Sequence, residues 1–133
     1  MKLTHDPPLP ARAVEGASFL QRVALLDGRR LVGAAAWYLP AGDDGAAQLV
    51  DLVVEPELRR KGHGGTLLDD AIAQARALCK LRRIPLRRLW VAVEHVRQVN
   101  ARSFLTKHGF HHTSTIPDLL RKQDLLVYVR SFD

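Results

Sequence analysis

The sequence predicts a single domain of the α/β (α+β) class, with a mixed sheet of about six strands and two main helices packed on it. Three observations predict this class. Alternating apolar runs dominate the first half of the chain, the hydrophobic period changes from two to 3.6 near residue 64, and both periods recur afterwards. The resulting order is three strands, helix, strand, helix and two strands. The third and fourth strands should therefore be parallel neighbours joined by a helical crossover.

Composition supports one compact domain. The chain has 133 residues, 47% of them hydrophobic, which is enough for a single core. No apolar run approaches the ~20 residues of a membrane span and no signal-peptide pattern occurs, so we expect a soluble, cytoplasmic protein with no membrane partner. The only cysteine, Cys79, falls on an apolar helix face and is expected to be a buried structural residue.

The first half of the chain is expected to form an antiparallel meander after an irregular arm. Residues 1–16 contain three prolines and little periodicity, so we place the folded domain at 17–133. Two apolar runs within residues 18–39 are joined by Asp27-Gly28, a dipeptide that favours a tight hairpin. A third strand follows over residues 47–55, and Pro56 ends it because proline cannot donate to a ladder.

The second half alternates helices and strands. Residues 64–80 carry apolar side chains at helical spacing, and residues 89–95 predict a buried strand. A shorter helix is predicted over residues 98–108, closed by Gly109 as a left-handed cap. The last two strands, 110–116 and 124–132, are expected to pair across a loop at residues 117–123.

Three successive cations and three glycines occupy the turn between the third strand and the first helix, in the stretch RRKGHGG at residues 59–65. Free N–H groups at a helix start converge on an anion, and glycine lets a phosphate approach the main chain. The turn lacks the lysine of a P-loop and the third glycine of the dinucleotide fingerprint. It therefore predicts a pyrophosphate site of another type.

The motif Arg59-x-x-Gly62-x-Gly64, between a strand and an amphipathic helix, resembles the acetyl-CoA-binding motif of the GNAT superfamily of N-acetyltransferases. The stretch ARSFLTKHGF, residues 101–110, resembles the second signature of the same family. The resemblance covers the chain from about residue 30 to the end. It implies a centrally splayed sheet whose third and fourth long strands separate to hold the pantetheine arm, with acetyl-CoA as co-substrate and no metal.

The resemblance also implies which residues bind the cofactor. The backbone of Leu52, Val53 and Val54 would bind the pantetheine arm and the thioester carbonyl, which gains negative charge as an amine attacks. The pyrophosphate would be bound by the glycine-rich turn and the residue after it: Arg59, Arg60, Lys61, Gly62, His63, Gly64, Gly65 and Thr66. Gln98 occupies the position of a family asparagine that contacts the cofactor.

The catalytic residues are less defined. Transfer to an amine needs a base for the nucleophile, and an acid assists the departing thiolate. The family's tyrosine acid position is Leu105 here, which cannot donate a proton. Glu94 and His95, at the end of the fourth strand, are our candidates for the base; Asp51 on the third strand is the other local carboxylate. Each could equally be a solvated strand residue.

The chain departs from the family pattern at its front. Only some twenty residues precede the hairpin, where the family usually has a strand and one or two helices that wall the acceptor pocket. We therefore expect a shortened amino-terminal part and an open acceptor side, which suits a bulky acceptor, a homodimer that completes the wall, or a module that binds acetyl-CoA without transferring the acetyl group. The acceptor amine itself is not defined by the sequence.

Two other kinds of ligand have weaker support in the sequence. The net charge of +6 suits polyanions, and a dense basic run could contact nucleic acid, but no reader motif is present and we interpret the run as a solvated helix end: Arg76, Lys80, Arg82, Arg83, Arg87 and Arg88. His108, His111 and His112 could suggest a metal. His111 and His112 are adjacent in a strand and face opposite sides, and no further ligand at zinc spacing lies near them, so no metal site is expected.

Overall fold

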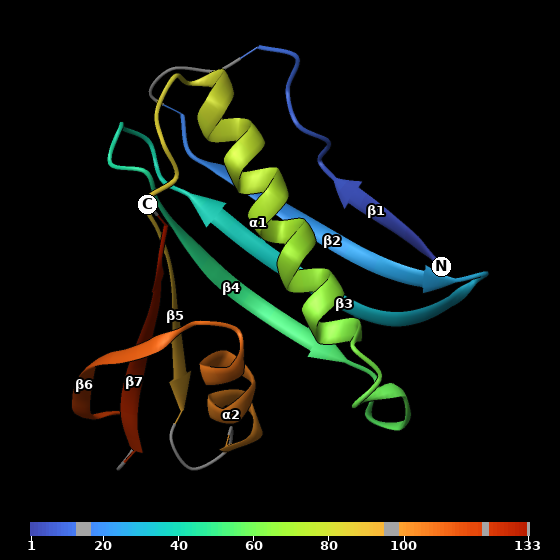
Figure 1. The fold of residues 1–133 in the computed structure, drawn as a ribbon, viewed down its shortest axis with the longest axis vertical. Helices are drawn as coiled ribbons and strands as arrows, with labels where there is room; N and C mark the ends of the chain where they lie inside the picture. Colours follow the sequence, from blue (N-terminus) through green and yellow to red (C-terminus); the bar gives the residue numbers. More distant parts are fainter. Residues whose placement is uncertain (13–16, 95–98, 121–122, 133) are drawn as a thin grey trace.

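The computed structural model describes residues 1–12, 17–94, 99–120 and 123–132. They form a seven-stranded mixed sheet in the order β1-β2-β3-β4-β5-β7-β6, with two α-helices (Figure 1). The elements are β1 (Lys2–Asp6), β2 (Phe19–Asp27), β3 (Arg30–Leu39), β4 (Ala46–Val54), the 3-10 helix η1 (Pro56–Leu58), α1 (His63–Leu81), β5 (Arg88–Glu94), α2 (Val99–Lys107), β6 (His111–Leu120) and β7 (Gln123–Ser131). The predicted class, the helices and the parallel β4–β5 pairing are confirmed.

The sheet has one strand more than predicted because the amino-terminal residues are not irregular. β1 pairs antiparallel with β2, with Leu3 opposite Leu25 and His5 opposite Val23. Leu3 packs against the core, and the His5 imidazole lies 2.8 Å from a carboxylate oxygen of Asp70 on α1. The prediction of an irregular arm was wrong here, because the prolines begin only after Asp6, where the strand ends.

The last hairpin also differs from the prediction. Residues 117–120, expected in a loop, belong to β6, and β7 begins at Gln123. The register between β6 and β7 shifts between Ile116 and Leu120. This irregularity accommodates Pro117, which has no N–H to donate to a regular ladder.

The core is one cluster, whose larger part lies between α1 and β2–β4 and which continues into β5, α2 and β7. α1 turns an apolar stripe onto β2–β4, while α2 lies beside the start of α1 and against β7 (Figure 1). Burial follows the 3.6-residue period in α1 and the two-residue period in β2, as the sequence pattern predicts. The fully buried side chains include Trp37, Phe110, Leu39, Leu67, Leu68, Leu78, Leu89, Val23, Val32 and Cys79.

Both helices end in the same way. At the end of α1 the Arg83 N–H donates to the Lys80 carbonyl and the Ile84 N–H to the Cys79 carbonyl, and Gly109 and Phe110 repeat this arrangement after α2. Gly109 has a φ of 86°, as predicted for a left-handed cap. None of the helices in the described part of the chain is long and apolar enough to cross a membrane.

One polar side chain, Gln21, is fully buried in this core. Its carbonyl oxygen accepts from the Trp37 indole N–H at 2.9 Å, and its amide donates to the Pro7 carbonyl and to Gln74 of α1. The amide therefore connects β2, β3, α1 and the segment after β1. A buried polar group is tolerated because its hydrogen bonds are made inside the protein.

Replacement of Gln21 by methionine is expected to lower the free energy of unfolding by about 2 kcal/mol, because the buried indole N–H of Trp37 would lose its acceptor. Urea unfolding followed by far-ultraviolet circular dichroism measures the change. The matched control is Gln48→Met on β4, whose side chain is only partly buried; we expect a change within about 0.5 kcal/mol. Equal effects at the two positions would contradict the role assigned to Gln21.

Candidate functional site

β4 and β5 separate along their length, and we call the region between their diverging edges the slot. The two strands pair only at Ala46↔Arg88, Ala47↔Leu89 and Gln48↔Trp90, and then diverge, as Figure 1 shows. A register shift between β3 and β4 places Leu49 opposite Trp37 and Asp51 opposite Ala36, so Val50 is an extra residue that bends β4. Beyond Gln48 the edge of β4 that faces β5 has no strand partner among the described residues. Its backbone N–H and C=O groups are therefore free for an extended ligand, apart from the Val54 carbonyl, which accepts from Arg59.

Leu52, Val53 and Val54 lie on this free part of β4. They pair with β3 on one side only, opposite Ala35, Ala34 and Gly33. Their main chain thus has one edge in the sheet and the other toward the slot. This is the arrangement that the predicted backbone contacts to a pantetheine arm require, and the assignment stays a prediction.

The glycine-rich turn leads from β4 into the start of α1. Gly62 is the N-cap of α1 with a φ of 84°, and Arg60 also has a positive φ, 64°. The Arg59 guanidinium folds back and its Nε donates to the Val54 carbonyl at 3.0 Å, which ties the turn to the end of β4. The turn is therefore held by backbone conformation and by Arg59.

The first turn of α1 presents donors. Gly62 makes no side-chain cap hydrogen bond, and the first intrahelical bond runs from the Thr66 N–H to the Gly62 carbonyl. The Thr66 hydroxyl donates to that same carbonyl at 3.1 Å. The N–H groups of residues 63–65 thus point out of the helix start, where the helix dipole favours an anion. Exposed Arg60 and Lys61 lie beside them.

Gly64 and Gly65 have a structural role that the sequence did not reveal. A Cβ on Gly64 would lie 3.1 Å from the Phe104 ring, and one on Gly65 would lie 3.1 Å from Cε1 of His108. The centroids of the two rings are 4.4 Å apart; Phe104 lies in α2 and His108 directly follows it, and together they pack the end of α2 against the start of α1. These glycines therefore permit the approach of α2, whereas Gly62 has nothing within 4 Å of a Cβ position.

His108 is consequently a neighbour of the predicted anion site that sequence reasoning missed. Its spacing of four residues from Phe104 places both on one face of α2, but nothing in the sequence links that face to the two glycines. It is not part of a metal centre in the described part of the chain. Among those residues there is no group of three or more His, Cys, Asp or Glu side chains that could hold a metal ion.

The sequence has two tyrosines, Tyr38 and Tyr128, that could take the proton-donor role that Leu105 cannot perform. Leu105 is 3% exposed in the core. The Tyr128 hydroxyl accepts from Arg102 Nε at 3.0 Å, and Tyr38 pairs across from Gln48 on β3–β4. Burial raises the pKa of the Cys79 thiol and nearby Arg82 partly opposes this, so the cysteine fits the structural role predicted for it.

The two candidates for the base are only partly covered by the structure. Glu94 is the last residue of β5 and pairs with Leu125 of β7, beyond the point where β4 and β5 separate. His95 and Gln98 lie outside the described residues. Asp51, the other carboxylate, is exposed on β4 opposite Ala36.

The basic run forms a separate feature at the far end of α1. A cavity of about 580 Å³ there is lined by Arg76, Lys80, Arg83, Ile84, Pro85, Leu86 and Phe132. The Arg76 guanidinium lies over the Phe132 ring at 4.8 Å. Since α1 has 19 residues, this end is roughly 28 Å from the glycine-rich turn. The cavity is therefore not part of the slot.

A splayed β4–β5 pair beside a glycine-rich helix start is the arrangement that the resemblance to the GNAT superfamily implies. Residues 4–110 match the model of the acetyltransferase (GNAT) family. The chain belongs to this family. No curated protein matches the chain.

Solved structures of the family share the fold at low sequence identity. A GNAT-family protein from Desulfovibrio desulfuricans has a TM-score of 0.73 and 19% identity over 84% of this chain and 69% of its own. A GNAT acetyltransferase from Elizabethkingia anophelis, solved with acetyl-CoA bound, has a TM-score of 0.69 and 15% identity over 85% and 76%. The ribosomal-protein-S18-alanine N-acetyltransferase of Escherichia coli has a TM-score of 0.63 and 15% identity over 90% and 72%.

Proposed function

We propose that this protein is an acetyl-CoA-dependent N-acetyltransferase that acts on an amine. The observation that carries the proposal is the slot between β4 and β5, with the donors of residues 63–65 beside it. An extended pantetheine arm fits a strand edge without a partner, and a pyrophosphate fits the start of α1. The acetyl-CoA-bound family member with the same fold supports this choice of co-substrate.

The reaction is direct transfer. The neutral amine attacks the thioester carbonyl carbon, the new C–N bond forms, and the C–S bond breaks as CoA leaves as a thiolate that takes up a proton. A main-chain N–H of the free β4 edge, at Leu52, Val53 or Val54, stabilises the charge that develops on the carbonyl oxygen. Glu94, alone or with His95, takes the proton of the amine. The thiolate is protonated by water, since Leu105 cannot do so.

A second function is favoured by one observation. Leu105 is buried where the family's tyrosine acid would stand. A protein that binds acetyl-CoA but transfers the acetyl group slowly would act as a sensor and regulate a partner. The two functions share the binding site and differ only in turnover.

One experiment separates them. Acetyl-CoA at one hundred times its Kd is expected to stabilise the protein by about 2.7 kcal/mol, a rise in Tm on the order of 10 °C. CoA should act similarly, and ADP, which has the pyrophosphate without the pantetheine arm, should act more weakly. Release of free CoA thiol is then followed with a panel of small amines and peptides with free amino termini.

The outcomes have distinct meanings. Thiol release that depends on one class of amine supports the transferase and identifies its acceptor. A thermal shift with release that no amine accelerates favours the sensor. The absence of any shift with acetyl-CoA or CoA would refute both functions.

A further inference from the structure

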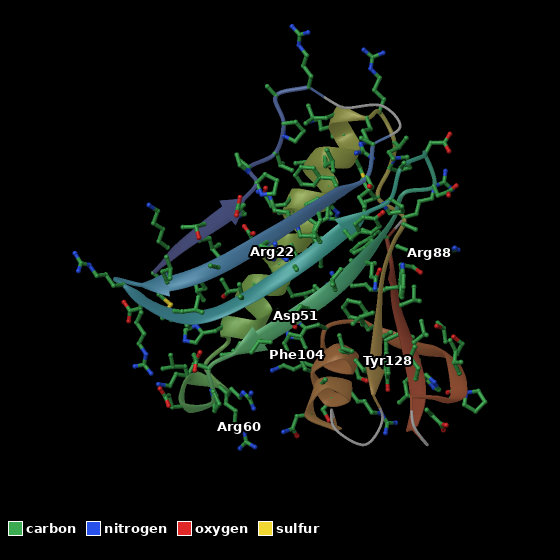
Figure 2. All side chains as sticks on the ribbon, turned by 180° about the vertical axis from the view of Figure 1, so that it is seen from behind. Arg22, Asp51, Arg60, Arg88, Phe104 and Tyr128 are labelled. Carbon is green, nitrogen blue, oxygen red and sulfur yellow. The ribbon has the colours of Figure 1, made fainter. Side chains whose placement is uncertain are left out.

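One face of the β2–β4 sheet has no covering element among the described residues. α1 covers the other face, and the view from behind in Figure 2 looks directly onto the uncovered one. Strand alternation and the pairing register assign its side chains. We call it the open face; it consists of Leu20, Arg22, Ala24 and Leu26 of β2, Leu31, Ala34, Ala36 and Tyr38 of β3, and Gln48, Asp51 and Val53 of β4, with the bulged Val50 beside them.

The open face is more apolar than a solvated sheet surface. Leu20 is 40% exposed, Leu31 45%, and Val50 and Val53 50% each. An antiparallel sheet with one solvated face usually alternates apolar and polar residues, but here the outward positions of β2 and β3 are largely apolar. A contiguous patch of this kind typically marks an interface.

The charges on the open face are arranged in one row. Arg22 on β2, Ala36 on β3 and Asp51 on β4 are successive partners in the register, and Figure 2 labels both charged residues on this face. They lie two strand spacings apart, roughly 9.6 Å, with only the alanine methyl group between them. No ion pair joins Arg22 to Asp51 within the described chain.

This row is self-complementary. A two-fold axis parallel to β3 that passes over Ala36 places β2 of one copy over β4 of the other. Arg22 then faces Asp51 of the partner subunit, and the symmetry repeats the pair with the roles exchanged. Ala24 faces the partner's Val53, and the alanines of β3 meet at the axis, where small side chains let the sheets approach. Stacked sheets lie about 10 Å apart, within reach of an arginine side chain.

From these observations we infer that the occupant of the open face is a second copy of this chain, held by two symmetry-related Arg22–Asp51 pairs around an apolar centre. Val53 belongs both to this face and to the free edge of β4. The partner subunit therefore borders the slot. The dimer does not depend on acetyl transfer, and its test needs no acetyl-CoA.

A charge-exchange experiment tests the dimer. Sedimentation equilibrium at 1 to ~100 μM protein is expected to give a dimer for the natural chain. Arg22→Asp and Asp51→Arg should each raise the dimer dissociation constant at least ~100-fold, because each turns both Arg22–Asp51 pairs into like-charged contacts. The double variant R22D/D51R restores both pairs with exchanged sides, and its dissociation constant should return to within about tenfold of the natural value.

Two controls keep the result interpretable. Lys80→Asp and Asp69→Arg make the same charge changes at exposed positions of α1, and they should leave the dimer unchanged. Asp6 lies opposite Arg22 in the register of β1 and β2, so it disfavours an aspartate at position 22 equally in the single and double variants. The comparison of the single variant R22D with the double variant R22D/D51R therefore isolates the contact with residue 51. Circular dichroism verifies that each variant is folded.

The proposal is overturned by any of three results. These are a monomer at ~100 μM for the natural chain, single charge reversals that leave the dimer intact, or a folded double variant that stays monomeric. An association that survives in the double variant but not in the singles is the specific signature of paired Arg22 and Asp51. A different protein bound to the open face of a monomeric chain would also refute it.

Discussion

Gly62→Asp is expected to weaken acetyl-CoA binding by about a hundredfold, about 2.7 kcal/mol. The new carboxylate would stand at the N-cap of α1, within reach of the N–H groups that we assign to the pyrophosphate, and would repel it. The fold should survive, because a Cβ on Gly62 meets no heavy atom within 4 Å. Calorimetric titration with acetyl-CoA measures the loss.

Gly62→Asn is the matched variant. Asparagine has nearly the same shape as aspartate, and both tolerate the positive φ of 84° better than other side chains do. Its effect on the Kd should stay below about tenfold, so the difference between the two variants reports the charge. The effect of Gly62→Asp should also shrink at high salt. Equal affinities for both variants and the natural chain would remove the pyrophosphate from the start of α1. Gly64 is a poorer position for this test because a side chain there would strike Phe104.

Glu94→Gln is expected to lower the rate of amine acetylation by about a hundredfold and leave the Kd for acetyl-CoA unchanged. General-base catalysis contributes factors of this size, and an amide cannot accept the proton of the amine. Glu94 follows the part of β5 that diverges from β4, which puts its backbone at the wide end of the slot. The measurement is single-turnover thiol release at saturating acetyl-CoA, over a range of pH.

Asp51→Asn is the comparison for this prediction. It neutralises the other local carboxylate, and we expect a loss of less than about tenfold. A hundredfold loss in Asp51→Asn with full activity in Glu94→Gln would move the base from β5 to β4, provided that sedimentation gives the same oligomeric state for Asp51→Asn and the natural chain. The pH profile adds a separate readout, because removing a general base removes the part of the fall at low pH that comes from protonation of that base.

The fold was predicted correctly where the hydrophobic period and the turn residues indicate the same element. α1 was expected at residues 64–80 and is found at His63–Leu81, and the crossover to a parallel β5 follows from its position between two strands. β1 was missed because Leu3, Thr4 and His5 are too short a pattern beside three prolines. Its strand is stabilised by a ladder with β2 and by the His5–Asp70 contact, which joins residues 65 positions apart in the chain.

The sequence motif indicated which residues form the candidate binding site, but it did not predict how these residues pack. Arg59-x-x-Gly62-x-Gly64 indicated where an anion would bind, but the reason for Gly64 and Gly65 emerged only from their contacts with α2. Similarly, alternation in β2 and β3 identified strands but not their faces, because GAAAW carries small residues on both sides. Long-range register was needed to show that Arg22 and Asp51 share one row.

The seating of α2 on α1 has a geometric consequence for the slot. The half of the sheet that includes β4 and the half that includes β5 are joined by three residue pairs at one end and, at the other, by the Phe104 and His108 rings resting on Gly64 and Gly65. The slot is thus bounded at both ends, by strand pairing at one end and by the contact of α2 with α1 at the other. A Cβ at residue 64 or 65 would press on the Phe104 or His108 ring at 3.1 Å, so these two glycines control how closely α2 approaches α1 and thereby influence the far end of the slot.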